Sequence, residues 1–561
     1  MERKIDCVFI GNNEIGTYEY EAIIKKMGKK SGAYRDLSLS LVELDGKLYS
    51  SMEMLNYLRG KKYKSTVKFE KLKYNELSPA IAYLGTFFEK EGFKFDFINS
   101  FQDEKEKLRK VLLEDDIKTI AITTTLYVMM LPILEIVSFI KKYNSKVKII
   151  VGGPFVFNQN QVLDEKSFKT TLETINADFY IINSQGEDAL AQLVKCIKTD
   201  KDYRKISNIA YKENNMYVIN DLFREDNKLD DNMVNWELFD KKVIGEYVSI
   251  RTSISCPFSC AFCGFPERAG EYKYIETKVL ENNLNRLRNL GTVKVIYFID
   301  DTFNVPKERF KEILRMMIKN KYDFKWNSMF RCQFADRETV ELMKQSGCQG
   351  VFLGIESASN TILKNMNKRA TKEDFRRGMK LLNEYEILTY TSFIIGFPGE
   401  TLETVNETLE FIKEMKPTFF RTQLWYCDHI TPIWKQKEKY EIQGSSFEWR
   451  HKTMDSKTAC DIIEKIFVEF QGSIWLPQYK FEVPSIYYLL NEGMSIDEIR
   501  IFLKEFNSIV AQKISKQGTI DGIKESLNKM EDVCSFNINQ NKNNEILLYG
   551  NKTEEDIFDF M

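Results

Sequence analysis

The sequence predicts an α/β protein: a Rossmann-like, flavodoxin-type sheet, then a partial (β/α)6 barrel and a helical C-terminal region. Short apolar runs alternate with amphipathic stretches over residues 79–197 and again over 247–425, and such alternation is typical of parallel sheets. At 561 residues the chain has room for several domains. We expect a first strand with an irregular insertion belonging to the first domain (1–75), the Rossmann-like domain (76–200), a linker (201–246), the barrel (247–430) and the helical region (431–561).

The composition gives no reason to expect a nucleic acid or a membrane as a partner. Lys and Arg number 81 against 82 Asp and Glu, so a net charge of -1 gives no reason to expect a nucleic acid partner. We find neither a leader nor an apolar run of about 18 residues, and therefore expect a cytoplasmic protein without membrane contact. In a reducing compartment the ten cysteines are expected to bind metal or pack in cores.

Elements of the first domain follow in order. A strand is expected over residues 5–10, and residues 17–76 are dense in charge with poor periodicity. The regular alternation then predicts helices at 81–91, 104–113, 133–143 and 187–197, and strands at 93–98, 119–124, 147–151 and 178–182.

Small and polar residues gather where these strands end, and the ligand of a doubly wound sheet lies beyond the carboxyl ends of its strands. Three loops therefore form one candidate site: Thr123, Thr124 and Thr125; Gly152 and Gly153; and Gln185, Gly186 and Glu187. A dinucleotide is disfavoured, because no Gly-x-Gly-x-x-Gly turn follows any strand.

The second alternation predicts a barrel with six strands and helices between most of them. The strands are expected at 247–251, 293–299, 326–330, 350–353, 390–395 and 419–425.

Three cysteines follow the first of these strands. Cys256, Cys260 and Cys263 lie within eight residues, on a loop able to wrap one inorganic centre. A structural zinc site normally has four protein ligands, whereas a [4Fe–4S] cluster with one open iron accommodates three thiolates. The alternatives are a zinc knuckle that borrows Cys332 or Cys348, or three buried thiols without a ligand.

The Cys-x3-Cys-aromatic-Cys pattern, with Phe262 as the aromatic residue, resembles that of the radical S-adenosylmethionine (SAM) superfamily. The stretches 297–303, 354–357 and 393–400 resemble the second-, fourth- and fifth-strand motifs of that superfamily. The resemblance implies a [4Fe–4S] cluster on the three cysteines as the catalytic centre, and SAM as cofactor. It implies the SAM contacts Phe262, Asp300, Asp301, Glu356, Ser357, Ile395 and Gly396.

Purely structural roles for some of these residues stay open. Asp300 and Asp301 have the residue type of a helix cap, and Glu356 that of a member of an internal ion pair.

An α/β domain before such a barrel is similar to that of the cobalamin-binding subgroup. The resemblance implies that the three loops named above hold cobalamin. The histidine that binds cobalt in the Asp-x-His-x-x-Gly version is missing, because no histidine precedes His429. Cobalamin held without a protein imidazole suits methyl transfer, but a domain that has lost cobalamin, or a purely structural sheet, fits this absence equally.

Beyond the sixth barrel strand, His429 is the candidate for a proton donor or acceptor on the substrate side, with a core histidine as the alternative. Residues 447–455 resemble the branch that includes the phosphinothricin P-methylase and peptide C-methylases. The resemblance implies a methyltransferase acting on an unactivated carbon or phosphorus of a small molecule or peptide, with a one-electron reductant such as flavodoxin or ferredoxin. The alternatives are a radical SAM cyclase, epimerase or rearrangement enzyme, and a non-enzymatic, metal-stabilised interaction protein.

Overall fold

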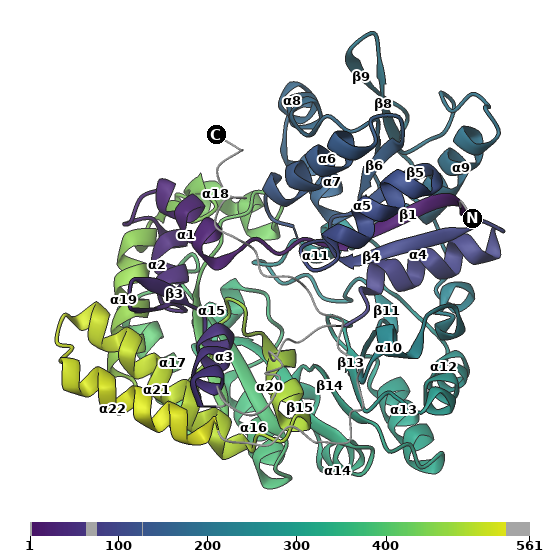
Figure 1. Ribbon diagram of the computed structural model, residues 1–561. Coiled ribbons are helices and arrows are strands. Elements are labelled where there is room, and N and C mark those ends of the chain that lie inside the picture. The colour runs from purple at the N-terminus through teal and green to yellow at the C-terminus, as the bar shows by residue number, and fades with distance from the viewer. Residues whose placement is uncertain (1–2, 63–75, 126, 535–561) are drawn as a thin grey trace.

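The computed structural model describes residues 3–62, 76–125 and 127–534. These residues form two mainly parallel sheets, the first in the upper part and the second in the lower part of Figure 1. The first sheet has the strand order β4-β1-β5-β6-β7-β8-β9. Its strands are β1 (Lys4–Asn12), β4 (Phe95–Ser100), β5 (Asp116–Thr123), β6 (Lys148–Gly152), β7 (Phe179–Ile181), β8 (Ile209–Glu213) and β9 (Met216–Ile219).

Strand β1 shows why this sheet is doubly wound. Cys7 and Phe9 pack into one core, whereas Val8 and Ile10 pack into a second core on the opposite face. Helices α4 and α9 contribute to the first core, and α5, α6, α7 and α8 to the second. Their bounds are α4 (Pro79–Lys90), α5 (Lys105–Glu114), α6 (Leu131–Tyr143), α7 (Pro154–Val162), α8 (Glu165–Ile175) and α9 (Glu187–Lys198).

Two parts of the chain differ from the expected domain limits. Residues 201–246 are not merely a linker, since β8 and β9 continue the first sheet as an antiparallel hairpin. They also hold the short helices η1 (Asp230–Asn232), η2 (Trp236–Leu238) and α10 (Lys241–Ile244).

The expected insertion packs mainly on the C-terminal half of the chain. It holds α1 (Thr17–Lys26), α2 (Gly32–Ser38), the hairpin β2 (Val42–Leu44) and β3 (Lys47–Tyr49), and α3 (Ser51–Lys62). Arg35 on α2 pairs with Asp461 at 2.7 Å and Glu464 at 2.6 Å, while Asp36 pairs with buried Arg421 at 2.7 Å. Local periodicity did not reveal these pairs because their partners lie hundreds of residues away.

The second sheet is the partial barrel, with the parallel order β10-β13-β14-β15-β16-β17-β21. The six expected strands are present, and a short seventh strand follows. They are β10 (Tyr247–Ile250), β13 (Val295–Phe298), β14 (Lys325–Met329), β15 (Cys348–Glu356), β16 (Leu388–Ile395), β17 (Phe419–Leu424) and β21 (Ile474–Trp475). The helices between them are α12 (Thr277–Leu290), α13 (Lys307–Lys319), α14 (Arg337–Gln345), α15 (Asn360–Asn365), α16 (Lys372–Glu384) and α17 (Leu402–Met415).

The C-terminal region is mostly helical, as expected, but it also contains a small three-stranded sheet. The elements of this region are η4 (Pro432–Gln436), α18 (Lys437–Tyr440), β18 (Gln443–Ser445), β19 (Glu448–His451), β20 (Met454–Asp455), α19 (Ser456–Glu469), α20 (Val483–Asn491), α21 (Ile496–Ser515) and α22 (Ile520–Val533).

The carboxyl ends of the two parallel sheets meet. Glu14, which follows β1, lies 3.9 Å from Lys480, which follows β21. Met129, from the loop after β5, shares an apolar cluster with Phe447. Loops at the ligand-binding ends of both sheets therefore line one interdomain region.

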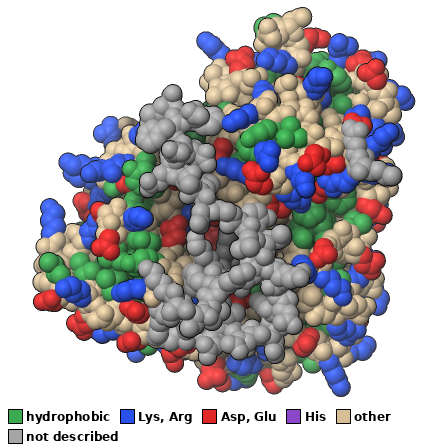
Figure 2. Space-filling model, in the orientation of Figure 1, with side chains coloured by type: hydrophobic (Ala, Val, Ile, Leu, Met, Phe, Trp, Pro, Cys, Tyr) green, Lys and Arg blue, Asp and Glu red, His purple; other side chains and the backbone are tan. Residues whose placement is uncertain are grey.

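Two surface properties bear on partners. Figure 2 shows lysine, arginine and carboxylate side chains interspersed over the face that it displays. Among the described residues, no helix has the length and apolar character needed to span a bilayer.

Candidate active site

The cysteine loop lies at the carboxyl end of the barrel. Together with α11 (Phe265–Ala269) it connects β11 (Ser253–Ile254) to β12 (Lys273–Tyr274), the two strands of an antiparallel hairpin. Its middle is clamped from two sides. The Ala261 N–H donates to the carbonyl of Met366 at 2.8 Å, and the N–H of Ile433 donates to the carbonyl of Ala261 at 2.9 Å. Segments after β15 and β17 thus hold the loop in place.

Each of the three sulfur atoms has one polar partner outside the set of thiols. The Cys256 sulfur lies 3.2 Å from the hydroxyl of Thr302, the Cys260 sulfur 3.8 Å from the guanidinium of Arg331, and the Cys263 sulfur accepts from the N–H of Phe265 at 3.4 Å. Hydrogen bonds to cysteine sulfur are among the features that set the potential of an iron–sulfur cluster.

Burial disfavours the charged thiolate form of the loop cysteines as long as no metal is bound. Burial raises the pKa of Cys256, and burial with the nearby charges of Cys260 and Cys256 raises the pKa of Cys263 to about 12. Without a metal these thiols stay protonated at neutral pH, whereas an iron centre binds and stabilises the thiolates.

The spacing of the thiols bears on the type of centre. Within the described part of the chain, no three His, Cys, Asp or Glu side chains converge on one metal-ion position. A zinc ion draws its thiolates to about 2.3 Å from one point, whereas a four-iron cluster takes each thiolate on a different iron. Three thiols on one loop match the number of thiolates that a cluster with one open iron takes.

Asp300 and Asp301 follow β13 and have different surroundings. Asp300 is buried and accepts from the N–H groups of Thr252 at 2.7 Å and Ser253 at 2.8 Å, so it ties β13 to the segment that leads into the cysteine loop. Asp301 is reached by solvent, yet desolvation by the surrounding protein and the charge of Asp300 raise its pKa to about 7. Neither caps the next helix, since the N-cap of α13 is Pro306. Contact of either with SAM stays a prediction.

Glu356 ends β15 at a register shift and has a left-handed φ of 68°. Its carboxylate lies 3.2 Å from Lys368, both side chains being almost buried. Ser357 points away from the barrel interior, because its hydroxyl accepts from the N–H of Ser359 at 3.2 Å and lies 3.4 Å from that of Thr408 on α17. Glu356 is therefore in the anticipated internal ion pair, which orients its carboxylate.

The turn after β16 is built around Gly396, whose φ of 89° favours glycine. Its N–H donates to Glu400 at 2.5 Å, and its carbonyl lies 3.0 Å from Nε2 of His451 on β19. A Cβ at Gly396 would run into the ring of Trp449. The C-terminal sheet thus buttresses the segment expected to lie against adenine, and Ile395 beside it is buried.

Phe262 lies between two of these features. Its ring is packed edge-on against Phe397, at 6.5 Å between ring centroids, and Lys368 lies 5.3 Å from its centroid. The aromatic residue of the cysteine loop therefore contacts both the Glu356 ion pair and the Gly396 turn.

In the first sheet, the predicted corrin loops meet at the carboxyl edge. The hydroxyl of Thr123 donates to the carbonyl of Ile10, at 3.0 Å, and that of Thr124 donates to the carbonyl of Gly152, at 2.8 Å. Gly153 has a φ of 105° and lies so close to Thr124 that a Cβ there would be crowded. These hydrogen bonds join β1, β5 and β6 at their carboxyl ends, where the backbone of Gly153 packs closely against Thr124.

Exposed side chains lie beside these hydrogen-bonded threonines. Thr125 is exposed, and the side chain of Val128 is 82% exposed, so both are accessible at this end of the sheet. Across the edge, Gln185 and Gly186 are half-buried, and Glu187 accepts from Asn227 at 2.9 Å.

Segment 222–227 crosses from this edge to the cysteine loop. Asn183, which follows β7, donates to the carbonyl of Phe223 at 2.6 Å, and Arg224 donates to the carbonyl of Ala269 on α11 at 2.9 Å. This strap joins the candidate corrin edge directly to the helix that follows the cysteines.

His429 is exposed, stacks on Trp434 at 3.7 Å between ring centroids, and its Nε2 lies 2.9 Å from the carbonyl of Gly444. It is therefore not a core histidine. A role in proton transfer stays a prediction.

Residues 250–412 match the family model of the radical SAM superfamily, and residues 66–194 match that of the B12 binding domain. The chain thus carries a radical SAM domain, which belongs to an enzyme superfamily that uses a [4Fe–4S] cluster and SAM, preceded by a cobalamin-binding domain.

Relatives agree with this arrangement. An uncharacterised methyltransferase of Pyrococcus horikoshii is 28% identical over 316 residues, covering 55% of this chain and 66% of the relative. The anaerobic magnesium-protoporphyrin IX monomethyl ester cyclase of Cereibacter sphaeroides is 24% identical over 385 residues, covering 64% and 60%. This chain therefore spans somewhat less than two thirds of these curated relatives.

Among solved structures, the radical SAM methyltransferase TsrM of Kitasatospora setae, with cobalamin and a [4Fe–4S] cluster bound, has a TM-score of 0.54 at 16% identity and covers 82% of this chain and 97% of its own. The cobalamin-dependent radical SAM enzyme OxsB has a TM-score of 0.53 at 14% identity, covering 87% and 91%. At these identities the likeness shows only that the two solved structures share the fold of this chain.

The structure adds site residues that sequence patterns missed. Arg331 and Thr302 each follow a barrel strand and contact a cysteine sulfur, and His451 supports Gly396 from the C-terminal sheet. A polar residue directly after a barrel strand was the available signal for the first two. His451 gave none, because its partner is 55 residues away.

Proposed function

We propose that this protein is a cobalamin-dependent radical SAM methyltransferase that methylates an unactivated carbon or phosphorus of a small molecule or peptide. The observation that carries the proposal is the strap, which ties the carboxyl edge of the cobalamin-binding sheet to the helix after the cysteine loop. A methyl donor on the first sheet and a radical source in the barrel would then face one substrate space.

The residues present fit the two cofactors. Cys256, Cys260 and Cys263 would hold the cluster, with one hydrogen-bonding partner for each sulfur. The carboxyl end of the first sheet, with Gly152 and Gly153 carrying no side chain and Val128 exposed beside them, would take a corrin. When bound, the cluster would supply the electron that cleaves SAM, and the corrin would carry the methyl group.

The chain's own residues contribute positioning. Lys368 holds the Glu356 carboxylate in place for hydroxyl or ammonium groups of SAM, and the Gly396 turn, supported from behind by Trp449 and His451, would lie against the adenine base. His429 is our candidate for proton transfer on the substrate side.

The test is anaerobic incubation of the reconstituted protein with SAM, hydroxocobalamin and titanium(III) citrate. We expect 5'-deoxyadenosine together with S-adenosylhomocysteine, and loss of both in Cys256→Ala, Cys260→Ala and Cys263→Ala. Cys332→Ala and Cys348→Ala should keep the iron, because neither residue is a ligand. Retention of iron in the first three variants would refute the proposal.

The cyclase relative supports a second candidate, radical chemistry without methyl transfer. The same assay separates the two, because this candidate predicts 5'-deoxyadenosine without S-adenosylhomocysteine.

A further inference from the structure

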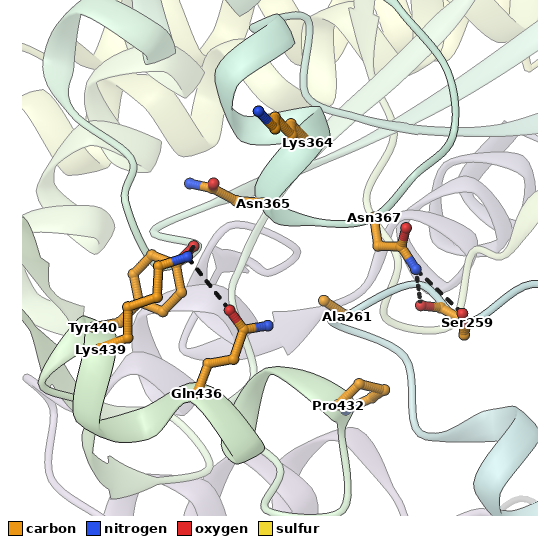
Figure 3. Close-up of a pocket in the computed structure, with 9 residues that line it drawn as sticks. All are labelled: Ser259, Ala261, Lys364, Asn365, Asn367, Pro432, Gln436, Lys439 and Tyr440. Carbon is orange, nitrogen blue, oxygen red and sulfur yellow. Dashed lines mark hydrogen bonds between the residues drawn. The ribbon is translucent and has the colours of Figure 1, made fainter.

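A pocket of about 280 Å³ lies on the outer side of the cysteine loop (Figure 3). Ser259 and Ala261, the residues on either side of Cys260, form part of its wall. Asn367, which follows α15, donates to the carbonyl of Ser259 at 2.8 Å and anchors that wall. The pocket therefore reaches the two residues that flank a cluster ligand in the sequence.

The rim of this pocket is cationic. Lys364 of α15 and Lys439 of α18 line it, and Lys435 and Lys437 are exposed in the same segment as Lys439. We call these four residues the lysine rim. Glu438 is the one acidic residue between positions 435 and 439. The rim thus has a clear positive excess in a chain whose net charge is -1.

The contacts of these lysines leave their charge in place. Lys439 donates to the hydroxyl of Tyr440 at 3.0 Å, and Lys437 lies 5.3 Å from the ring centroid of Trp434. A neutral hydroxyl and an aromatic ring orient an ammonium group without cancelling its charge. The positive field of the rim is therefore directed at solvent.

Another side of the cysteine loop is covered. The strap contacts α11 through Arg224, and Asp226 pairs with Lys273 of β12 at 2.6 Å. On the pocket side, by contrast, Ser259 is exposed. An electron carrier that must come close to the cluster finds the open approach there.

We propose that the lysine rim is the docking surface for a small acidic electron-transfer protein of the flavodoxin or ferredoxin class. On docking, the reduced carrier gives up one electron and the cluster bound by Cys260 gains it. This inference rests on the proposed radical SAM function. Acidic carriers complement the rim in charge, and such complementarity raises association rates and selects partners.

A charge-reversal experiment tests the proposal. In Lys364→Glu/Lys439→Glu, we expect the KM for reduced flavodoxin in SAM cleavage to rise about tenfold, because like charges then face each other. Cleavage driven by titanium(III) citrate, which needs no docking, should stay unchanged. The matched control is Lys319→Glu/Lys344→Glu, at the C-terminal ends of α13 and α14 and hence at the opposite end of the barrel; it should behave like the wild type.

Salt gives a second readout. The kcat/KM for flavodoxin should fall with ionic strength in the wild type and become nearly flat in the rim variant. An unchanged KM in the rim variant overturns the proposal, and so does an equal loss with both reductants, which would mean that the lysines only hold the loop. Failure of the proposed function is distinguishable, since wild type would then form no 5'-deoxyadenosine even with titanium(III) citrate.

Discussion

The guanidinium of Arg331 lies 3.8 Å from the sulfur of Cys260. It is 8% exposed, stacks 3.7 Å from the ring centroid of Phe258 and donates to the carbonyl of Lys368. Strand β14 therefore places a permanent positive charge, held by the cysteine loop itself, beside one cluster ligand.

Replacement of this charge should lower the potential of the cluster. A hydrogen bond from a charged group is worth about 1.5–3 kcal/mol, and 59 mV corresponds to about 1.4 kcal/mol for one electron. We expect Arg331→Met to shift the midpoint down by roughly 50–100 mV, measured by EPR-monitored redox titration. Thr302→Val, which removes a neutral partner of Cys256, should shift it less. Equal midpoints in Arg331→Met and wild type would contradict this role.

His451 positions Gly396 from a distant sheet. Burial lowers the pKa of His451, so its ring is neutral at pH 7. Because Nδ1 accepts from the N–H of Thr453 at 3.4 Å, Nε2 carries the proton and donates to the carbonyl of Gly396. His451→Leu should therefore weaken SAM binding several-fold in isothermal titration, while His451→Gln, which retains a donor, should recover most of the affinity. An equal loss in both variants would point to packing alone.

The strands could be predicted because their patterns are local. The six barrel strands and the first five strands of the N-terminal sheet lie within a few residues of their expected positions, since buried parallel strands form short apolar runs between amphipathic helices. The cysteine loop was equally visible, because its three ligands lie within eight residues.

Long-range contacts were not visible in this way. The segment that carries Arg35 is polar and weakly periodic, and its place is decided by Glu464, more than 400 residues later. The same holds within the site: the side chains of Asp300 and Ser357 make internal hydrogen bonds whose partners no motif reveals, and their contacts with SAM remain predictions. Sequence motifs thus located the site's strands better than the direction of individual side chains.

Glu400 makes stability depend on pH. Its carboxyl is buried behind Gly396, and desolvation raises its pKa to about 8 from an ordinary 4.5. The folded state therefore binds this proton more tightly than the unfolded state, and stability falls as pH rises from 4.5 towards 8. At about 1.4 kcal/mol per pKa unit, the loss amounts to several kcal/mol.

Glu400→Gln keeps an acceptor for the Gly396 N–H but cannot ionise. Thermal unfolding measured from pH 5 to 9 should show a smaller drop in Tm for the variant than for the wild type. Glu414→Gln, on the exposed surface of α17, is the control: it loses the ion pair with Arg376, but its change in Tm from pH 5 to 9 should equal that of the wild type. Parallel curves for Glu400→Gln and wild type would show that Glu400 is charged in the fold.

A substitution at Val128 tests whether a corrin lies against the loop after β5. It should not disturb the fold, because the side chain is 82% exposed. If this loop lies against a corrin, Val128→Glu replaces an apolar contact with a charge, and loss of about 1.5 kcal/mol corresponds to roughly tenfold weaker binding. Absorbance titration with hydroxocobalamin measures the affinity. Met216→Glu is the matched control. Met216 is 66% exposed, but it begins β9 at the end of the sheet away from the carboxyl ends of the parallel strands. If both variants bind as tightly as the wild type, the corrin does not touch the loop after β5.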